Sequence, residues 1–378
     1  MNSKLVSRQF RTLIVTAAIL YTLSACSEHE ELPLEPEPGP RAWQIVDSIP
    51  GQIELFGMQM IDSLSGTAVG SLGSIIQTID GGASWESQAS GYSGFLFGVS
   101  FANDSIGTAI GQEGTILKTV DGGLTWIKHS GGTNENLLGV HFTHTDTGYV
   151  VSEEGSIIRT TDGGVNWVAQ NSGTTDRLSG VAFISSDTGI VVGIGGRILR
   201  TTDGGTNWIS QVGVTGNWLR AVAFLNSTHG FAVGDRGTIL LTTDGGVSWK
   251  TKVSGTSNHL TAVSFVDAGV AFVVGQNGTI LMSPDGGNTW VSQTSGVLGW
   301  LLGVSFGNSQ VGVAVGESGI VLKTTTGGSP PPIASTPHTG NLPSTRFTLP
   351  GGFNTYITIV NSAAAIVTPL ITSMLISG

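Results

Sequence analysis

The residues most suggestive of chemistry are six aspartates in the motif Thr/Ser-x-Asp-Gly-Gly-x-x-Trp. Each follows the previous one by 41 residues: Asp80, Asp121, Asp162, Asp203, Asp244 and Asp285. Paired carboxylates carry out acid–base and nucleophilic steps in glycoside hydrolysis. Such a site needs two groups with different roles, whereas these six are interchangeable. We therefore predict a structural role, in which the carboxylate accepts backbone N–H bonds in a tight turn and glycine supplies positive φ.

Two other motifs resemble active-site residues. The stretch 303–307 matches the Gly-x-Ser-x-Gly nucleophile motif, but Ser305 occupies the same repeat position as Ser100 and Ser264. His141 and His144 are the nearest approach to a metal-binding pair, yet no third ligand accompanies them. We predict that they are polar residues at a strand end. Since no phosphate loop, dinucleotide fingerprint or calcium loop is found, the sequence predicts no cofactor, no metal and no enzymatic activity.

The 41-residue interval extends to the whole of each repeat. Glycine precedes an apolar run at Gly73, Gly114, Gly155, Gly196, Gly237, Gly278 and Gly319. Phenylalanine recurs at Phe101, Phe142, Phe183, Phe224, Phe265 and Phe306, with Met60 in the first copy. A seventh motif, at residues 325–328, has lost its acid and its tryptophan. Seven equal units without insertion or deletion predict seven equivalent structural elements.

Each unit contains four short apolar segments separated by turn residues. In the second unit the first segment ends at Phe101, the second and third cover residues 108–111 and 115–119, and the fourth begins at Trp126. This pattern predicts an all-β, seven-bladed β-propeller over residues 42–328. The last copy lacks its fourth strand, and residues 42–46 resemble one, so we expect the N-terminal strand to close the ring. An open solenoid, the competing repeat architecture, would gain nothing from this split.

The segments outside the repeats indicate export. Residues 1–25 have a basic start, an apolar run and small residues before Cys26, the single cysteine. This layout resembles the lipobox of bacterial lipoproteins, in which the cysteine is acylated; the alternative is an ordinary signal peptide. We predict a signal peptide over 1–25, lipidation at Cys26, and an acidic, proline-rich tether over 26–41. The expected localisation is a membrane-anchored lipoprotein of the periplasm or cell surface.

Beyond the repeats, residues 329–345 read as a proline-rich linker and residues 346–378 as an uncharged, apolar tail of unknown structure. The tail is marginal as a membrane helix because Asn361 and two prolines interrupt it. The net charge of −10 disfavours binding to a phosphate backbone. We therefore expect no nucleic-acid partner.

The Asp-box motif with its 41-residue period resembles the photosystem II assembly and stability factor-like family of propellers, and more distantly the repeats of sialidases. The family resemblance implies a binding or assembly scaffold for membrane-protein subunits. A sialidase would need an arginine cluster, a tyrosine nucleophile and a Phe/Tyr-Arg-Ile-Pro element. That element is absent from the sequence, and Arg41 is the sole arginine between the leader and Arg159.

A partner surface is expected on the face opposite the Asp boxes, where the repeats differ from one another. The residue that enters each innermost strand varies without any repeat constraint: Glu54, Phe95, Asn136, Arg177, Trp218, His259 and Trp300. In units three to five, four arginines could form one positive patch: Arg177, Arg197, Arg220 and Arg236. Trp218, His259 and Trp300 would border it. Arginine and tryptophan are enriched at protein-binding hot spots, although scattered solvated residues would look the same.

The sequence thus predicts a non-catalytic, lipid-anchored protein-binding or assembly scaffold, whose expected partner is a protein, such as a component of a membrane or envelope complex. The alternative is a glycan-binding or sialidase-like surface protein, which the shared Asp-box motif and the tryptophans suggest.

Overall fold

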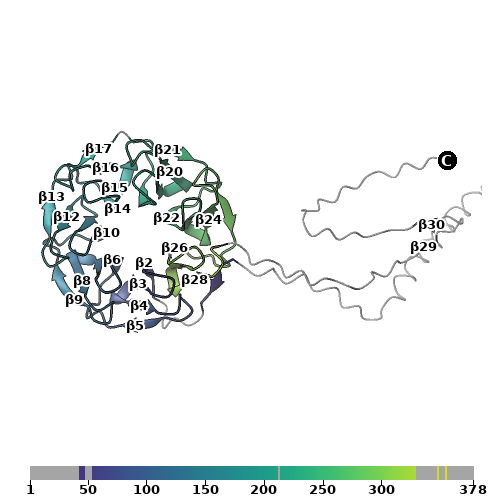
Figure 1. Ribbon diagram of the computed structural model, residues 1–378, viewed down its shortest axis with the longest axis horizontal. Helices are drawn as coiled ribbons and strands as arrows, with labels where there is room; N and C mark the ends of the chain where they lie inside the picture. Colours follow the sequence, from purple (N-terminus) through teal and green to yellow (C-terminus); the bar gives the residue numbers. More distant parts are fainter. Residues whose placement is uncertain (1–41, 47–52, 212, 329–346, 349–353, 356–378) are drawn as a thin grey trace, which may run out of the picture. The chain divides into compact units, whose positions relative to one another are not determined.

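The computed structural model describes residues 42–46, 53–211, 213–328, 347–348 and 354–355. Residues 42–328 form seven four-stranded antiparallel sheets arranged as blades around a central axis (Figure 1). The predicted seven-bladed β-propeller is therefore confirmed. Six of its connections contain a single turn of 3₁₀ helix. No helix in the described part of the chain is long and apolar enough to cross a membrane.

The blades follow the repeat, one after another along the chain. Blade 1 comprises β2 (Leu55–Met60), β3 (Gly66–Gly70), β4 (Ile75–Thr78) and β5 (Glu86–Gln88). The next blades are β6 (Leu96–Phe101), β7 (Gly107–Gly111), β8 (Thr115–Thr119), β9 (Ile127–Ser130); β10 (Leu137–Phe142), β11 (Gly148–Ser152), β12 (Ile157–Thr160), β13 (Val168–Gln170); and β14 (Leu178–Phe183), β15 (Gly189–Gly193), β16 (Ile198–Thr201), β17 (Ile209–Ser210).

Blades 5 to 7 complete the ring. Their strands are β18 (Leu219–Phe224), β19 (Gly230–Gly234), β20 (Thr238–Thr242), β21 (Lys250–Lys252); β22 (Leu260–Phe265), β23 (Ala271–Gly275), β24 (Ile280–Ser283), β25 (Val291–Gln293); and β26 (Leu301–Phe306), β27 (Gly312–Gly316), β28 (Val321–Thr324), β1 (Gln44–Ile45). In blades 1, 2, 4, 5, 6 and 7 a turn of 3₁₀ helix joins the second and third strands. In that order these turns are η1 (Ser71–Gly73), η2 (Gln112–Gly114), η3 (Ile194–Gly196), η4 (Asp235–Gly237), η5 (Gln276–Gly278) and η6 (Glu317–Gly319).

The ring closes through the N-terminal strand, as the sequence predicts. Strand β1 pairs antiparallel with β28, with Gln44 opposite Lys323 and Ile45 opposite Leu322 (Figure 1). The Val46 N–H also donates to the Val321 carbonyl at 2.9 Å. Strands from the two ends of the propeller therefore share blade 7, so that no blade is left with an unpaired third strand.

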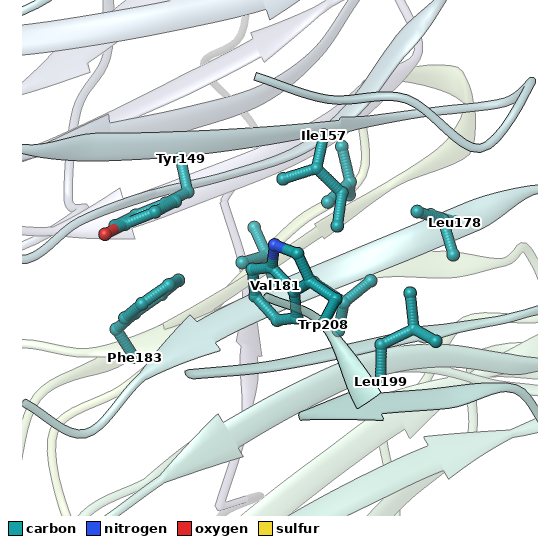
Figure 2. Close-up of a cluster of buried hydrophobic side chains, with 9 residues drawn as sticks. Tyr149, Ile157, Leu178, Val181, Phe183, Leu199 and Trp208 are labelled. Carbon is teal, nitrogen blue, oxygen red and sulfur yellow. The ribbon is translucent and has the colours of Figure 1, made fainter. Parts of the chain in front are cut away.

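The hydrophobic core lies between adjacent blades. Figure 2 shows one such cluster, in which Tyr149 and Ile157 of blade 3 pack against Leu178, Phe183 and Trp208 of blade 4. The rings of Tyr149 and Phe183 stack at 3.7 Å, and Phe183 meets the edge of Trp208 at 5.9 Å. The Asp-box tryptophan thus covers the seam between two sheets.

Small residues line the axis because the innermost strands approach one another closely. A Cβ atom on Gly57 would lie 2.8 Å from the Phe97 carbonyl oxygen of the next blade, and one on Gly139 would lie 3.0 Å from that of Ser179. These distances are too short for a side chain. The glycine or alanine at this repeat position is therefore a packing requirement of the ring.

Several sequence-based predictions lie outside the described residues: the signal peptide over 1–25, lipidation at Cys26, the tether over 26–41, the linker over 329–345 and most of the tail over 346–378. Within the tail, β29 (Phe347–Thr348) and β30 (Asn354–Thr355) pair as a short antiparallel ladder.

Candidate binding surface at the channel mouth

The six Asp-box carboxylates lie in turns between the third and fourth strands of their blades. In blade 1, Asp80 accepts hydrogen bonds from the backbone N–H groups of Ala83 and Ser84, each at 2.9 Å. The hydroxyl groups of Ser84 and Thr78 donate to the same carboxylate at 2.6 and 2.8 Å. The Thr78 hydroxyl also accepts the Gly82 N–H at 2.8 Å. Four donors therefore hold this carboxylate in the turn.

These bonds favour the ionised carboxylate. They lower the pKa of Asp80, Asp121 and Asp162 to about 2, chiefly through Ser84, Thr125 and Asn166 respectively. The pKa values of Asp203, Asp244 and Asp285 are also lowered. An acid that gives a proton to a substrate near neutral pH needs a raised pKa. The Asp boxes are therefore turn-stabilising groups in their geometry and their electrostatics.

The other motif residues lie on the innermost strands and link blades. The Ser305 hydroxyl accepts the Met60 N–H of the neighbouring blade at 3.0 Å, and the Ser100 hydroxyl accepts that of Phe142 at 3.2 Å. His141 takes the equivalent position, where burial lowers its pKa to about 4. His144 is exposed in the following turn, and the described residues contain no cluster of three or more groups that could bind a metal ion.

A central channel runs along the propeller axis, with a cavity of about 210 Å³. Its wall carries residues from the innermost strands of all seven blades, including Phe56, Leu138, Ser179, Arg220 and Leu302. We define the channel mouth as the end of this cavity that lies beside the turns between second and third strands. The strand-entry residues are at this end, because the Trp218 carbonyl accepts the N–H of Asp235 in η4 at 2.8 Å.

Arg177, Trp218 and Arg220 form a stack at the channel mouth. The Arg177 guanidinium lies 4.9 Å from the centre of the Trp218 ring, and that of Arg220 lies 4.0 Å from it. The indole N–H donates to the Ser179 hydroxyl at 2.7 Å, which fixes the ring. Each cation–π contact contributes about 0.5–2 kcal/mol. The stack holds the two guanidinium groups in defined positions, although their positive charges repel each other.

His259 and Trp300 extend this stack around the ring. Their rings lie parallel, with centroids 5.7 Å apart, and Arg220 lies 6.0 Å from the Trp300 ring. The Asp235 carboxylate accepts a bond from Arg220 Nε at 2.5 Å and lies 3.0 Å from His259 Nδ1. We call Arg177, Trp218, Arg220, His259 and Trp300 the cationic–aromatic cluster.

Two of the predicted arginines lie apart from this cluster. Arg197 forms an ion pair with Asp176 and donates to Ser210 on the outermost strand of its blade. Arg236 is exposed in η4 and lines a separate groove with Asn217 and the segment 251–257. The four arginines also come from two adjacent blades, 4 and 5, and not from three units as the sequence-based count had it. The side chains of Arg197 and Arg236 therefore lie outside the cationic–aromatic cluster.

Within the cluster, Arg177 is the cation with spare bonding capacity. Its only ion pair, with Glu153, is long at 3.9 Å, and its buried Nε–H has no partner among the described residues. Burial lowers the pKa of Arg177, an effect that Glu153 opposes and Arg220 reinforces. A half-desolvated guanidinium with a free donor favours a bound carboxylate or other anion. Arg220, by contrast, is neutralised by Asp235.

Residues 129–215 match the family model described as Photosynthesis system II assembly factor YCF48. Over this stretch the chain is similar to the photosystem II assembly factor-like family of Asp-box propellers. No curated protein matches its sequence.

Solved structures agree on the fold of this Asp-box propeller. YCF48 from Cyanidioschyzon merolae is 24% identical with a TM-score of 0.62, covering 75% of this chain and 98% of that one. A structure described as YCF48 bound to D1 peptide is 22% identical with a TM-score of 0.65, covering 78% and 100%. A glycoside hydrolase, GH74 from Niastella koreensis, is 14% identical with a TM-score of 0.63, covering 75% of this chain and 53% of that one. At these identities the likeness establishes the fold.

The sequence interpretation missed two features of the propeller. Trp43 lies directly before β1, as each Asp-box tryptophan lies before its fourth strand, and it fills the place of the missing seventh tryptophan. Phe56 and Phe97 lie at the channel mouth with Phe95. The signal for the phenylalanines was present: two residues after the strand-entry position, the repeats read Phe56, Phe97, Leu138, Ser179, Arg220, Thr261 and Leu302.

Proposed function

We propose that the protein is an exported, non-catalytic scaffold that binds a protein partner at the channel mouth, with the cationic–aromatic cluster as the binding surface. The observation that supports this proposal is the Arg177–Trp218–Arg220 stack, in which the Arg177 guanidinium is partly desolvated and its buried Nε–H has no partner among the described residues. Arginine and tryptophan in a half-buried setting are typical of interface hot spots. The description of a related propeller as bound to D1 peptide supports a protein ligand.

The geometry of the tryptophans favours a protein over a glycan. Both guanidinium groups lie over the Trp218 ring, and His259 stacks on one face of Trp300. The Trp218 ring is already in contact with two guanidinium groups, which leaves less of its face for stacking on a sugar. An anionic, peptide-like group aligned with the Arg177 fork fits this surface better.

The membrane anchor is part of the proposal. We propose that Cys26 is acylated after removal of residues 1–25, so that residues 27–41 tether the propeller to the membrane. The proposed site is the periplasm or cell surface, and the partner is an envelope protein complex. Incorporation of a labelled fatty acid into the full chain is the test: it should occur in the native protein and be absent in Cys26→Ala. Labelling that persists in Cys26→Ala would exclude this anchor.

The binding test uses two variants that remove the same charge. The full chain with Arg177→Gln is expected to lose its protein partner in a crosslinking and mass-spectrometry experiment in cells. Arg197→Gln, which removes an arginine paired with Asp176 outside the cluster, should retain it. If both variants capture the same partner as the native protein, the cationic–aromatic cluster is not the binding surface. Turnover of a fluorogenic sialoside by the purified protein would refute the non-catalytic assignment.

A further inference from the structure

Phenylalanines form a second feature of the channel mouth, on blades 1 and 2. The Phe56 ring lies 5.9 Å from Phe95 and 5.5 Å from Phe97, and Phe95 lies 6.2 Å from Phe97. All three rings retain contact with solvent, and Phe95 is 38% exposed. We call these residues the phenylalanine cluster.

The fold does not require these aromatic residues. At the position of Phe56 and Phe97, three other blades carry Ser179, Arg220 and Thr261 on the same strand with the same pairing. Phenylalanine at this position is therefore particular to blades 1 and 2, where it leaves apolar surface in contact with water. Contiguous exposed apolar surface of this kind marks interaction sites.

One residue of each cluster lines the same channel cavity. Phe56 and Arg220 both line the channel, together with Leu138 and Leu302. In this lining the larger apolar side chains Phe56, Leu138 and Leu302 come from blades 1, 3 and 7, and the polar ones, Ser179 and Arg220, come from blades 4 and 5. Below it the wall is lined by glycine, alanine, valine and Met58, which leaves space for an inserted side chain.

We infer that the channel mouth selects a peptide segment with two features: an aromatic or aliphatic side chain that packs on the phenylalanine cluster, and an aspartate or glutamate a few residues away that pairs with Arg177. The inference rests on the proposed protein-binding function and specifies the chemistry of the ligand. The apolar group supplies buried area and the carboxylate pairs with the exposed part of the Arg177 guanidinium, whose ion pair with Glu153 is long at 3.9 Å, so both are needed for tight binding. Charge complementarity and the shared cavity favour this occupant.

A library of random peptides displayed on phage, selected on the immobilised full chain, tests the inference. Enriched peptides should combine an apolar residue and an acid at a fixed spacing. The repeat supplies a conservative variant, Phe97→Ser, because blade 4 has Ser179 at the same position. This variant should weaken an enriched peptide at least tenfold, and Arg177→Gln should do the same. Ile127→Ser, which removes an exposed aliphatic residue from the outermost strand of the same blade, should not change the affinity.

The outcomes separate the two levels of the proposal. Enriched peptides that are acidic without an apolar residue, and that bind Phe97→Ser as well as the native chain, overturn the phenylalanine subsite while the binding function stands. Failure to enrich any peptide that depends on Arg177 counts against the binding function itself. A native chain that sediments as a dimer and becomes monomeric in Phe97→Ser would show that a second copy covers the cluster, which also overturns the inference.

Discussion

Replacing Trp43 by alanine should open the propeller at its seam. Trp43 is fully buried between blades 6 and 7, where it meets the edges of Phe272 at 5.7 Å and Phe306 at 5.9 Å. Its indole N–H donates to Gln293 at 2.7 Å, and Gln293 in turn donates to the Gly328 carbonyl. One side chain therefore ties together the two ends of the ring.

The expected loss follows from the area that the indole buries. A buried tryptophan removes about 200 Å² from water, which at about 25 cal/mol per Å² corresponds to about 5 kcal/mol. Because real unfolded chains already bury part of this area, we expect about 4 kcal/mol for Trp43→Ala, in line with the usual range for such substitutions. For a domain of this size the melting temperature should fall by about 10 °C.

Urea unfolding measures the loss, and amide hydrogen exchange locates it. Strand β1 has only two register pairs with β28, so without Trp43 it should detach, and the amides of residues 321–324 should lose protection. Trp126→Ala is the matched control: it removes a similarly buried indole from blade 2, whose four strands are continuous in the chain. It should cost similar stability and leave residues 321–324 protected. A loss below about 1 kcal/mol in Trp43→Ala, with protection unchanged, would refute the closure argument.

The remaining predictions concern pH and packing. Burial lowers the pKa of His141 to about 4, so that as the pH falls the unfolded chain binds the proton before the folded chain does. The free energy of unfolding should therefore fall by about 2 kcal/mol as the pH drops from 6.5 to 4. His141→Ser should remove this loss in urea titrations at pH 7 and 4.5, and an unchanged loss would contradict the assignment. The Asp-box carboxylates, with pKa values lowered to about 2 in three boxes, stabilise the fold above pH 4, and this contribution should disappear as the pH falls toward 2; Asp121→Asn should flatten that part of the acid-unfolding curve. In Gly234→Ala the new Cβ would lie 2.0 Å from the Trp218 carbonyl, and in Gly307→Ala it would lie 1.8 Å from that of Asp62, in the turn that follows β2. Both should cost about 1–3 kcal/mol, but only Gly234→Ala should weaken binding at the cationic–aromatic cluster, as isothermal titration with an enriched peptide would show.

The repeat made most of the fold predictable. A fixed interval of 41 residues implies equivalent units, and alternating apolar residues with glycine-rich turns imply four short strands in each. Complementary deficits at the two ends implied closure by residues 42–46, and the pairing of β1 with β28 confirms it. These inferences succeeded because strand pairing and turn geometry depend on local sequence.

The candidate site was less predictable because it depends on contacts between blades. Repeat alignment placed Arg177, Trp218, His259 and Trp300 at one end of the innermost strands, where the structure also has them. It could not separate Arg197 and Arg236 from them, since Arg197 pairs with Asp176 and Arg236 lines a separate groove with the segment 251–257. Direction and pairing of long side chains are settled by neighbours that are distant in the sequence.

Sequence alone thus determined the number of blades, the four strands in each, the Asp-box turns and the strand that closes the ring. Only the tertiary structure decided that Trp43 replaces the missing seventh tryptophan, that two arginines share the Trp218 ring, and that Phe56 lines the same channel as Arg220. The physical reason is the ring itself: it brings the equivalent ends of seven strands, each 41 residues from the next, around one cavity, where residues that no local pattern connects come into contact.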